Sequence, residues 1–138
     1  MRSLTGLAAA ALALAGCETA FVGTPPGGRY ILTEVDGRAV PTPAPQPPAC
    51  RPIWHDGWFD LDPIARQFEL YLQQRDSCTG AVVRETRETG SYLRSDGRLR
   101  LETTAPGGST RRWTAAESGR SVTLRYGDNR LLFRQPRP

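Results

Sequence analysis

The sequence contains no lysine and only one histidine, His55, among its 138 residues. A single histidine cannot form a zinc site of recognisable spacing without further ligands. His55 is followed by Asp56, but neighbouring side chains on a strand point to opposite faces, so this pair is poorly placed for acid-base catalysis. The sequence also lacks the Gly-x-Ser-x-Gly motif of α/β-hydrolases. We therefore expect no enzyme and no cofactor.

Charge and glycine patterns narrow the choice of partners. All 18 basic residues other than His55 are arginine, against 14 acidic residues, which gives a formal net charge of +4. This mild excess suits contact with anionic lipid or polysaccharide and does not indicate nucleic-acid binding.

The glycine pairs at 27–28 and 107–108 lack the strand-to-helix context of a phosphate-binding loop, so we expect turns there. No segment has the apolar spacing typical of a helix.

The chain opens with Arg2 and then an uncharged, mostly apolar stretch that ends at residue 17. A transmembrane helix needs about 20 apolar residues, and this shorter stretch has the pattern of a secretory signal peptide. The residues that close it, Leu14-Ala15-Gly16-Cys17, match the motif of bacterial lipoprotein signal peptides at every position. The sequence therefore resembles this lipoprotein family.

The lipoprotein resemblance implies cleavage before Cys17, with residues 1–16 as the signal peptide and lipid attached to Cys17. Two or more acyl chains anchor a protein stably, so the mature chain would be anchored rather than membrane-spanning. In this family Glu18, in place of aspartate, is compatible with sorting to the outer membrane. We expect a cell-envelope protein that faces the periplasm, with residues 17–28 as a lipidated tether.

If Cys17 carries lipid, Cys50 and Cys78 are the two cysteines that remain. An oxidising exported compartment favours a disulfide between them. Two free thiols or a metal site are the alternatives, although a metal would need further ligands.

After the tether, short runs of alternating apolar and polar residues are separated by turn residues such as Asp36-Gly37 and Asp96-Gly97. Regular short strands with turn signals are typical of a sandwich or a barrel. The proline-rich segment 41–48 cannot supply ladder hydrogen bonds, and we expect an extended loop there. Eight strands are predicted, at residues 29–35, 55–62, 67–73, 80–93, 98–104, 110–116, 120–126 and 129–135.

Hairpin-length links favour an up-and-down meander, and eight strands are enough to close it and remove its edges. We therefore expect an all-β fold, a small antiparallel barrel over residues 29–135, with a β-sandwich as the alternative. The side chains predicted to point inward are Tyr30, Leu32, Phe59, Leu61, Phe68, Leu70, Leu72, Leu99, Leu101, Trp113, Val122, Leu124, Tyr126, Leu131 and Phe133.

The mature chain contains the motifs Gly28-Arg29-Tyr30-Ile31-Leu32-Thr33-Glu34-Val35-Asp36-Gly37, Pro41, Cys50, Gly57-Trp58-Phe59-Asp60-Leu61, Cys78, Gly90-Ser91-Tyr92 and Asp96-Gly97-Arg98-Leu99-Arg100-Leu101. In these motifs it resembles small lipocalin-like bacterial lipoproteins of undefined function. The resemblance covers most of the mature chain and implies a fold more than a role. Lysozyme-inhibitor and META-type lipoproteins are similar in size, anchor and β-rich build.

The same alternation predicts an exterior aromatic surface. If Phe59 and Leu61 point inward, Trp58 points outward. Tyr71 points outward on the next strand for the same reason, with Trp54 close by. Exposed aromatic clusters are enriched where proteins bind proteins or sugars. The alternative is that the proline-rich loop folds over these three rings and buries them.

Together these features predict a membrane-anchored envelope lipoprotein that acts as a binding module. We expect the bilayer as a partner through acylated Cys17, an envelope protein or a glycan as a second partner, and no nucleic acid. The alternative is a periplasmic inhibitor or a structural envelope lipoprotein without a small-molecule ligand.

Overall fold

The computed structural model describes residues 27–42 and 49–137. The expected signal peptide, Cys17, nearly all of the expected tether and most of the proline-rich segment lie outside the described residues. Among the described residues, no helix is long and apolar enough to cross a membrane. The strands are β1 Gly28–Val35, β2 Arg38–Ala39, β3 Pro52–Asp62, β4 Gln67–Asp76, β5 Val82–Ser95, β6 Arg98–Thr104, β7 Thr110–Ser118, β8 Ser121–Tyr126 and β9 Asn129–Arg134.

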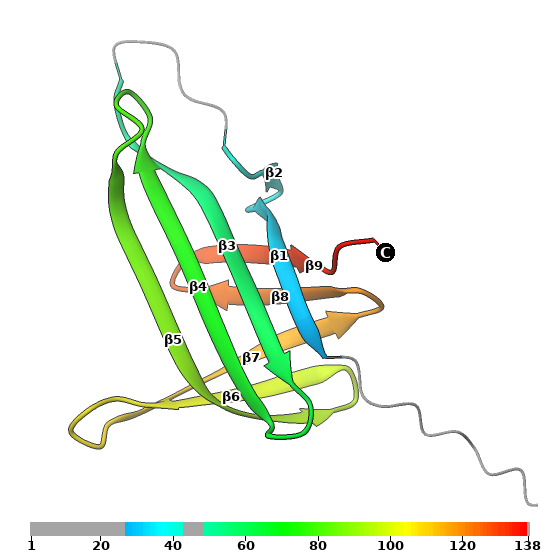
Figure 1. Cartoon of the computed structure of the whole chain (residues 1–138). Helices are drawn as coiled ribbons and strands as arrows, with labels where there is room; N and C mark the ends of the chain where they lie inside the picture. The colour runs from blue at the N-terminus through cyan, green and yellow to red at the C-terminus, as the bar shows by residue number, and fades with distance from the viewer. Residues whose placement is uncertain (1–26, 43–48, 138) are drawn as a thin grey trace, which may run out of the picture.

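The strands form one closed antiparallel sheet (Figure 1). β1 pairs with β3, each strand from β3 to β9 pairs with the next, and β9 returns to pair with β1. β2 is a short extra strand that pairs with the end of β1. The fold is therefore a barrel of eight strands with one additional strand, which confirms the predicted all-β barrel over the sandwich.

Tight turns connect the hairpins where the sequence predicted them. Asp36 and Gly37 both have positive φ, at 51° and 79°, and so do Asp96 and Gly97, at 51° and 71°. Two central residues with positive φ characterise the type I′ turn, whose twist matches that of the strands it joins. These local signals fix the hairpin registers on either side.

Because side chains alternate between the two faces of each strand, apolar side chains fill the barrel. The Phe59 ring lies at the centre, 5.8 Å from the Phe68 ring and 5.9 Å from the Phe133 ring. Of the predicted inward set, Trp113 and Tyr126 are only partly buried against the core. The buried apolar residues are Tyr30, Leu32, Val35, Phe59, Leu61, Phe68, Leu70, Leu72, Tyr92, Leu99, Leu101, Ala115, Val122, Leu124, Leu131 and Phe133.

Val35 joins the core because β1 contains a bulge. Leu32 lies opposite Phe133 and Glu34 lies opposite Leu132, so Thr33 is an extra residue in the ladder. One extra residue moves all following side chains to the other face of the sheet. A strict alternation from Tyr30 misses this change.

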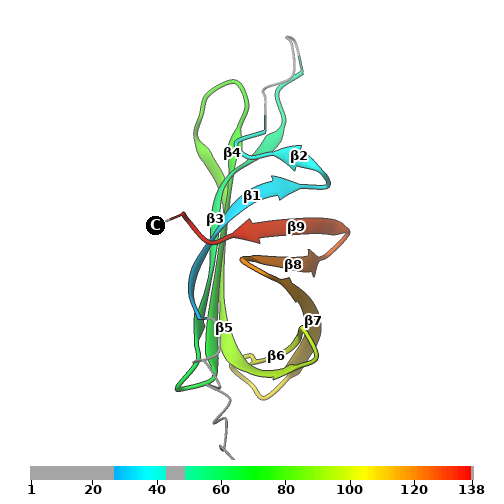
Figure 2. The same ribbon diagram turned by 90° about the vertical axis from the view of Figure 1, so that its right-hand side faces the viewer.

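β3 and β4 are longer than predicted. β3 begins at Pro52 rather than at His55, and β4 continues to Asp76 rather than ending at Gln73, because the ladder runs on to pair Pro52 with Asp76. The added residues of β4 are polar, so apolar alternation gave no sign of them. Figures 1 and 2 show β3, β4 and β5 as a long, nearly flat sheet that extends past β8 and β9.

β5 turns from this flat sheet into the curled part of the barrel (Figure 2). It pairs with β4 along residues 82–91 but with β6 only along residues 91–95. A Cβ atom at Gly90 would lie 2.0 Å from the carbonyl oxygen of Glu102 on β6. Only glycine allows the two backbones to approach this closely.

Candidate functional site

A row of four side chains crosses the outer face of the long sheet. Ile31 on β1 lies opposite Trp58 on β3, Trp58 lies opposite Tyr71 on β4, and Tyr71 lies opposite Arg87 on β5. Directly opposite residues share a face of the sheet, with Cβ atoms about 5 Å apart. The row therefore places two rings side by side on the exterior.

Two arginines lie over these rings. The Trp58 and Tyr71 rings stack with centroids 5.6 Å apart and planes 23° apart. The guanidinium of Arg29 lies 4.2 Å from the Trp58 centroid, and that of Arg87 lies 5.7 Å from the centroids of both rings. We call Trp58, Tyr71, Arg29 and Arg87 the aromatic patch.

Carboxylates hold both arginines in position. Arg29 Nη2 lies 2.7 Å from Asp60 Oδ2, and Arg87 Nη1 lies 3.1 Å from Glu69 Oε1. Both arginine side chains remain more than half exposed, at 53% and 63%. Exposed ion pairs contribute little to stability. Their effect here is to fix cations over the rings while leaving other guanidinium N–H groups free to donate.

A hydrogen-bond network orients Tyr71. Its hydroxyl donates to Glu85 Oε1 at 2.7 Å, and the buried amide of Gln73 donates to the Tyr71 hydroxyl at 2.9 Å. The hydrogen bond to the Glu85 carboxylate raises the pKa of Tyr71, and the same bond lowers the pKa of Glu85. At neutral pH the phenol is thus held as a donor to a charged carboxylate, which fixes the ring.

The aromatic patch presents groups that are suited to binding. It offers half-buried ring surface and guanidinium donors, which match carboxylates and sugar hydroxyls. The four strands that carry it are hydrogen-bonded to their neighbours, so the patch is preorganised. The possibility that the proline-rich loop covers it involves residues 43–48, which lie outside the described residues.

Trp54 does not belong to this surface, which corrects the expected grouping. Trp54 lies opposite Gln74 and Asp56 lies opposite Gln73, so His55 is an extra residue that reverses the faces of β3. Trp54 consequently packs partly buried against the core. It lines a hollow of about 160 Å³ at the barrel mouth, together with Leu72, Gln74, Arg84, Thr86, Tyr126, Gly127 and Asn129.

His55 and Asp56 do not hydrogen-bond to each other. Asp56 Oδ1 accepts a hydrogen bond from the backbone of Gly57 at 2.7 Å. Nδ1 of the half-buried His55 has no partner among the described residues. This geometry is the one expected of a histidine at the extra position of a β-bulge.

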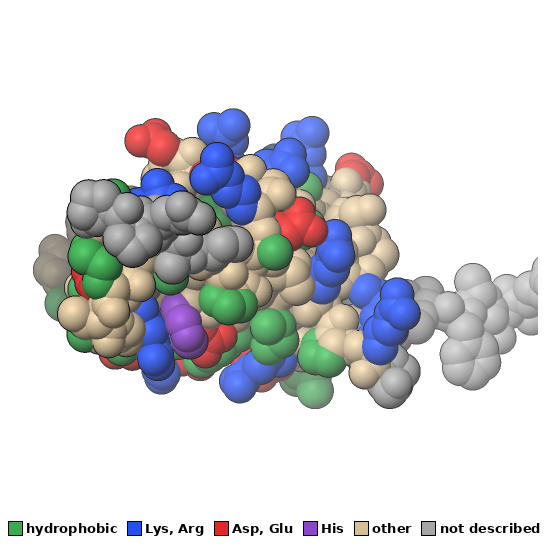
Figure 3. Space-filling view, turned by 90° about the horizontal axis from the view of Figure 1, so that it is seen from above, with side chains coloured by type: hydrophobic (Ala, Val, Ile, Leu, Met, Phe, Trp, Pro, Cys, Tyr) green, Lys and Arg blue, Asp and Glu red, His purple; other side chains and the backbone are tan. Residues whose placement is uncertain are grey.

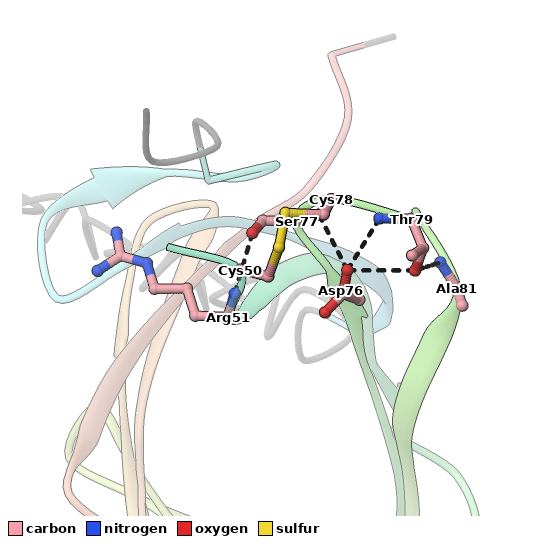
Figure 4. Close-up of a disulfide and its surroundings, with 7 residues drawn as sticks. All are labelled: Cys50, Arg51, Asp76, Ser77, Cys78, Thr79 and Ala81. Carbon is pink, nitrogen blue, oxygen red and sulfur yellow. Dashed lines mark hydrogen bonds between the residues drawn. A yellow bond between two sulfur atoms is a disulfide. The ribbon is translucent and has the colours of Figure 1, made fainter. Parts of the chain in front are cut away.

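Cys50 and Cys78 form a disulfide, as predicted (Figure 4). It joins the start of β3 to the β4–β5 turn, beside a hydrogen bond from the Arg51 backbone to Ser77 Oγ. Asp76 Oδ1 accepts from the backbone N–H groups of Thr79 and Cys78, which lowers the pKa of Asp76. The two sulfurs lie near the Asp76 carboxylate but are bonded to each other, which resolves the alternatives of free thiols or thiolate ligands.

A polar cluster on the inner face of the sheet, partly open to solvent, was not predicted. Glu88 Oε1 accepts from Arg111 at 2.8 Å and from the Tyr126 hydroxyl at 3.0 Å. Arg111 lies 4.4 Å from the Trp113 centroid. Burial, reinforced by the Glu88 hydrogen bond, raises the pKa of Tyr126. Extending the alternation back from Tyr92 would have placed Glu88 inward.

Figure 3 shows arginine and acidic side chains interspersed over the upper end of the molecule, without a single-sign field on that face. Comparisons with protein-family models, with curated proteins and with solved structures found no match to this chain.

Proposed function

We propose that this protein is a lipid-anchored lipoprotein of the bacterial cell envelope that acts as a binding module through its aromatic patch. Its partner is an envelope protein or a glycan that carries carboxylates, and it has no enzymatic activity. The observation that carries this proposal is the stacked Trp58–Tyr71 pair, held on a flat sheet face beneath two exposed arginines. Aromatic residues and arginine are the side chains most enriched at binding hot spots.

The anchor half of the proposal rests on Leu14-Ala15-Gly16-Cys17 and on Glu18. Lipid on Cys17 would hold the barrel at a membrane, and Glu18 is compatible with the outer membrane, periplasmic side. The Cys50–Cys78 disulfide agrees with an oxidising compartment.

The anchor is tested by replacing Cys17 with serine in the full chain. The wild type should float with membranes in a density gradient and incorporate labelled fatty acid, whereas Cys17→Ser should do neither. A Cys17→Ser chain that still floats with membranes would show that the anchor lies elsewhere.

The patch is tested with Trp58→Ala/Tyr71→Ala. Lipidated protein would be used to capture envelope proteins, and separately to probe an array of anionic glycans. We expect the double variant to lose the captured partner, while Ile64→Ala keeps it, because Ile64 is 91% exposed on the β3–β4 turn away from the patch.

The free energy of unfolding of the double variant distinguishes a binding role of the two rings from a role in the core. Loss of a cross-strand ring pair and its cation contacts should cost about 1 to 2 kcal/mol. Partner loss with a fall in stability of this size supports the proposal. Retained capture, or unfolding of the double variant, contradicts it.

A further inference from the structure

The outer edge of β5 carries unused hydrogen-bonding groups along residues 84–90. β4 covers the other edge of this stretch, whereas β6 pairs with β5 only from Ser91 onward. In the part of the chain that the structure describes, no further strand pairs here, and Figure 1 shows none beside the upper half of β5. An open edge of this length is a template for pairing with another chain.

The backbone groups of Glu85, Arg87 and Thr89 face this open edge. The N–H of Tyr92 points to the β4 side, where it donates to the Arg66 carbonyl at 2.9 Å. The pairing of β5 with β4 is regular from Ser91 back to Arg84. Because backbone direction alternates along a strand, the odd-numbered residues in this stretch point away from β4.

The side chains on the edge are complementary to themselves. The segment reads Arg84-Glu85-Thr86-Arg87-Glu88. When a second copy runs antiparallel with Thr86 opposite Thr86, each Arg84 faces a Glu88 and each Glu85 faces an Arg87. Every charge of the segment then lies opposite a charge of the other sign.

Neighbouring registers lack this property. In an antiparallel pair, opposite residues must both point their backbone groups toward the partner or both away from it, so the twofold axis passes through a residue. An axis at Glu85 or Arg87 sets that residue against itself, and an axis at Arg84 or Glu88 does the same. Like charges directly opposite are destabilising, so of the registers centred on residues 84–88 the one centred on Thr86 is favoured, and it alone sets every charge of the segment opposite the other sign.

We propose that the protein forms a twofold homodimer in which residues 84–88 of β5 pair antiparallel with the same residues of a second copy. Such an isologous contact extends the β3–β4–β5 sheet from one barrel into the next and closes both open edges. Val82 and Val83, which are 47% and 48% exposed at the start of β5, lie at the two ends of the contact.

Existing contacts leave groups for this pairing. Glu88 uses Oε1 for Arg111 and Tyr126, and its Oε2 has no partner among the described residues. Glu85 uses Oε1 for Tyr71 and Gln73. The Arg87 guanidinium has five N–H donors, and its ion pair with Glu69 is formed through Nη1. Charged side chains on edge strands often prevent pairing. Edge charges that prevent self-association repel a second copy, whereas the charges of this segment, in the order in which they occur, attract one.

Charge reversal and mixing test the register. The full chain with Cys17→Ser would be studied by sedimentation velocity over a wide concentration range. Glu85→Arg sets two arginine pairs opposite each other in the homodimer, and Arg87→Glu sets two glutamate pairs opposite each other. Two pairs that change from attractive to repulsive should weaken each homodimer roughly tenfold or more. An equimolar mixture of the two variants restores every opposite-charge pair, so it should dimerise like the starting protein.

Cross-linking provides a second measurement that does not depend on charge. Thr86 is the one residue that faces its own copy, and it lies in a non-hydrogen-bonded pair, the closer kind. Thr86→Cys should therefore form an intermolecular disulfide on mild oxidation. Thr89→Cys is the matched control, because its two copies would lie about 20 Å apart in this register.

Several outcomes would overturn the proposal. If the starting protein stays monomeric and Thr86→Cys does not cross-link, the homodimer is excluded. The open edge of β5 would then be available to a strand of another protein. A dimer that persists in both single variants, or that does not return on mixing, would place the interface elsewhere. Circular dichroism and melting of each variant show that it is folded before its association is measured.

Discussion

Gly90→Ala should be the most damaging single-methyl addition in the barrel. The added Cβ would lie 2.0 Å from the Glu102 carbonyl oxygen, and 2.9 Å from both the Glu102 carbonyl carbon and Phe68 Cε1. The nearest two atoms belong to backbone, which cannot rotate away as the end of a side chain can. β5 and β6 must therefore separate by about 1 Å at the point where their pairing begins.

The expected cost exceeds that of ordinary overpacking. Extra methyl groups in a packed core cost about 1 to 3 kcal/mol, and a backbone clash at the start of a ladder should reach at least the upper end. For a domain of this size, about 3 kcal/mol corresponds to a fall in Tm of roughly 10 to 20 °C. Urea unfolding followed by tryptophan fluorescence would measure the free energy.

Two other glycines serve as graded controls. Gly80→Ala meets no atom within 4 Å but has φ of 71°, so it should cost only about 1 to 2 kcal/mol. Gly57→Ala should fall between them, because its Cβ would lie 3.0 Å from a Leu32 methyl and 3.0 Å from the Tyr71 carbonyl oxygen. If Gly90→Ala loses less stability than Gly80→Ala, the close approach of β5 and β6 is not a real constraint.

The disulfide and the tyrosines provide two further predictions. Cys50 and Cys78 are 28 residues apart, and replacing both with serine should lower the free energy of unfolding by roughly 3 to 4 kcal/mol. Urea titrations would measure this loss. A loss near zero would show that the Arg51–Ser77 contacts already close the loop. Burial raises the pKa of Tyr30, Tyr92 and Tyr126, and the Glu85 hydrogen bond raises that of Tyr71. Stability from these protonated phenols is complete below the unfolded pKa of about 10 and is lost as pH rises through the raised values. Tyrosinate absorbance should therefore appear only at pH above about 10, and ionisation of the buried Tyr30 and Tyr92 should accompany loss of the β-sheet circular dichroism signal. A buried tyrosine that ionises near its ordinary pKa in the folded protein would contradict this.

Local patterns were sufficient to predict the barrel and its outer rings. Asp36-Gly37 and Asp96-Gly97 specify tight turns through the positive φ that their residues tolerate, and alternation around Phe59 and Phe68 distinguishes the inner from the outer face. Both signals depend only on residues within one hairpin. The order and direction of the strands follow from them.

The two bulges could not be predicted in the same way. Thr33 and His55 each add one residue to a strand, and this brings Val35 into the core and turns Trp54 away from Trp58. Nothing in the local sequence distinguishes an extra residue from a regular one. The bulge arises because two neighbouring strands need different lengths to cross the same barrel wall.

Contacts between distant strands were decided by the tertiary structure alone. Arg29 reaches Trp58 because β1 pairs with β3, and Arg111 on β7 reaches Glu88 on β5 because the sheet curls; these pairs are separated by 29 and 23 positions in the chain. Alternation in the sequence determined which residues face outward wherever the strands are regular. Pairing between strands then decided which outward residues meet, because it sets Trp58 opposite Tyr71 and Tyr71 opposite Arg87. The open edge of β5 was decided by where β6 leaves β5, beside Gly90.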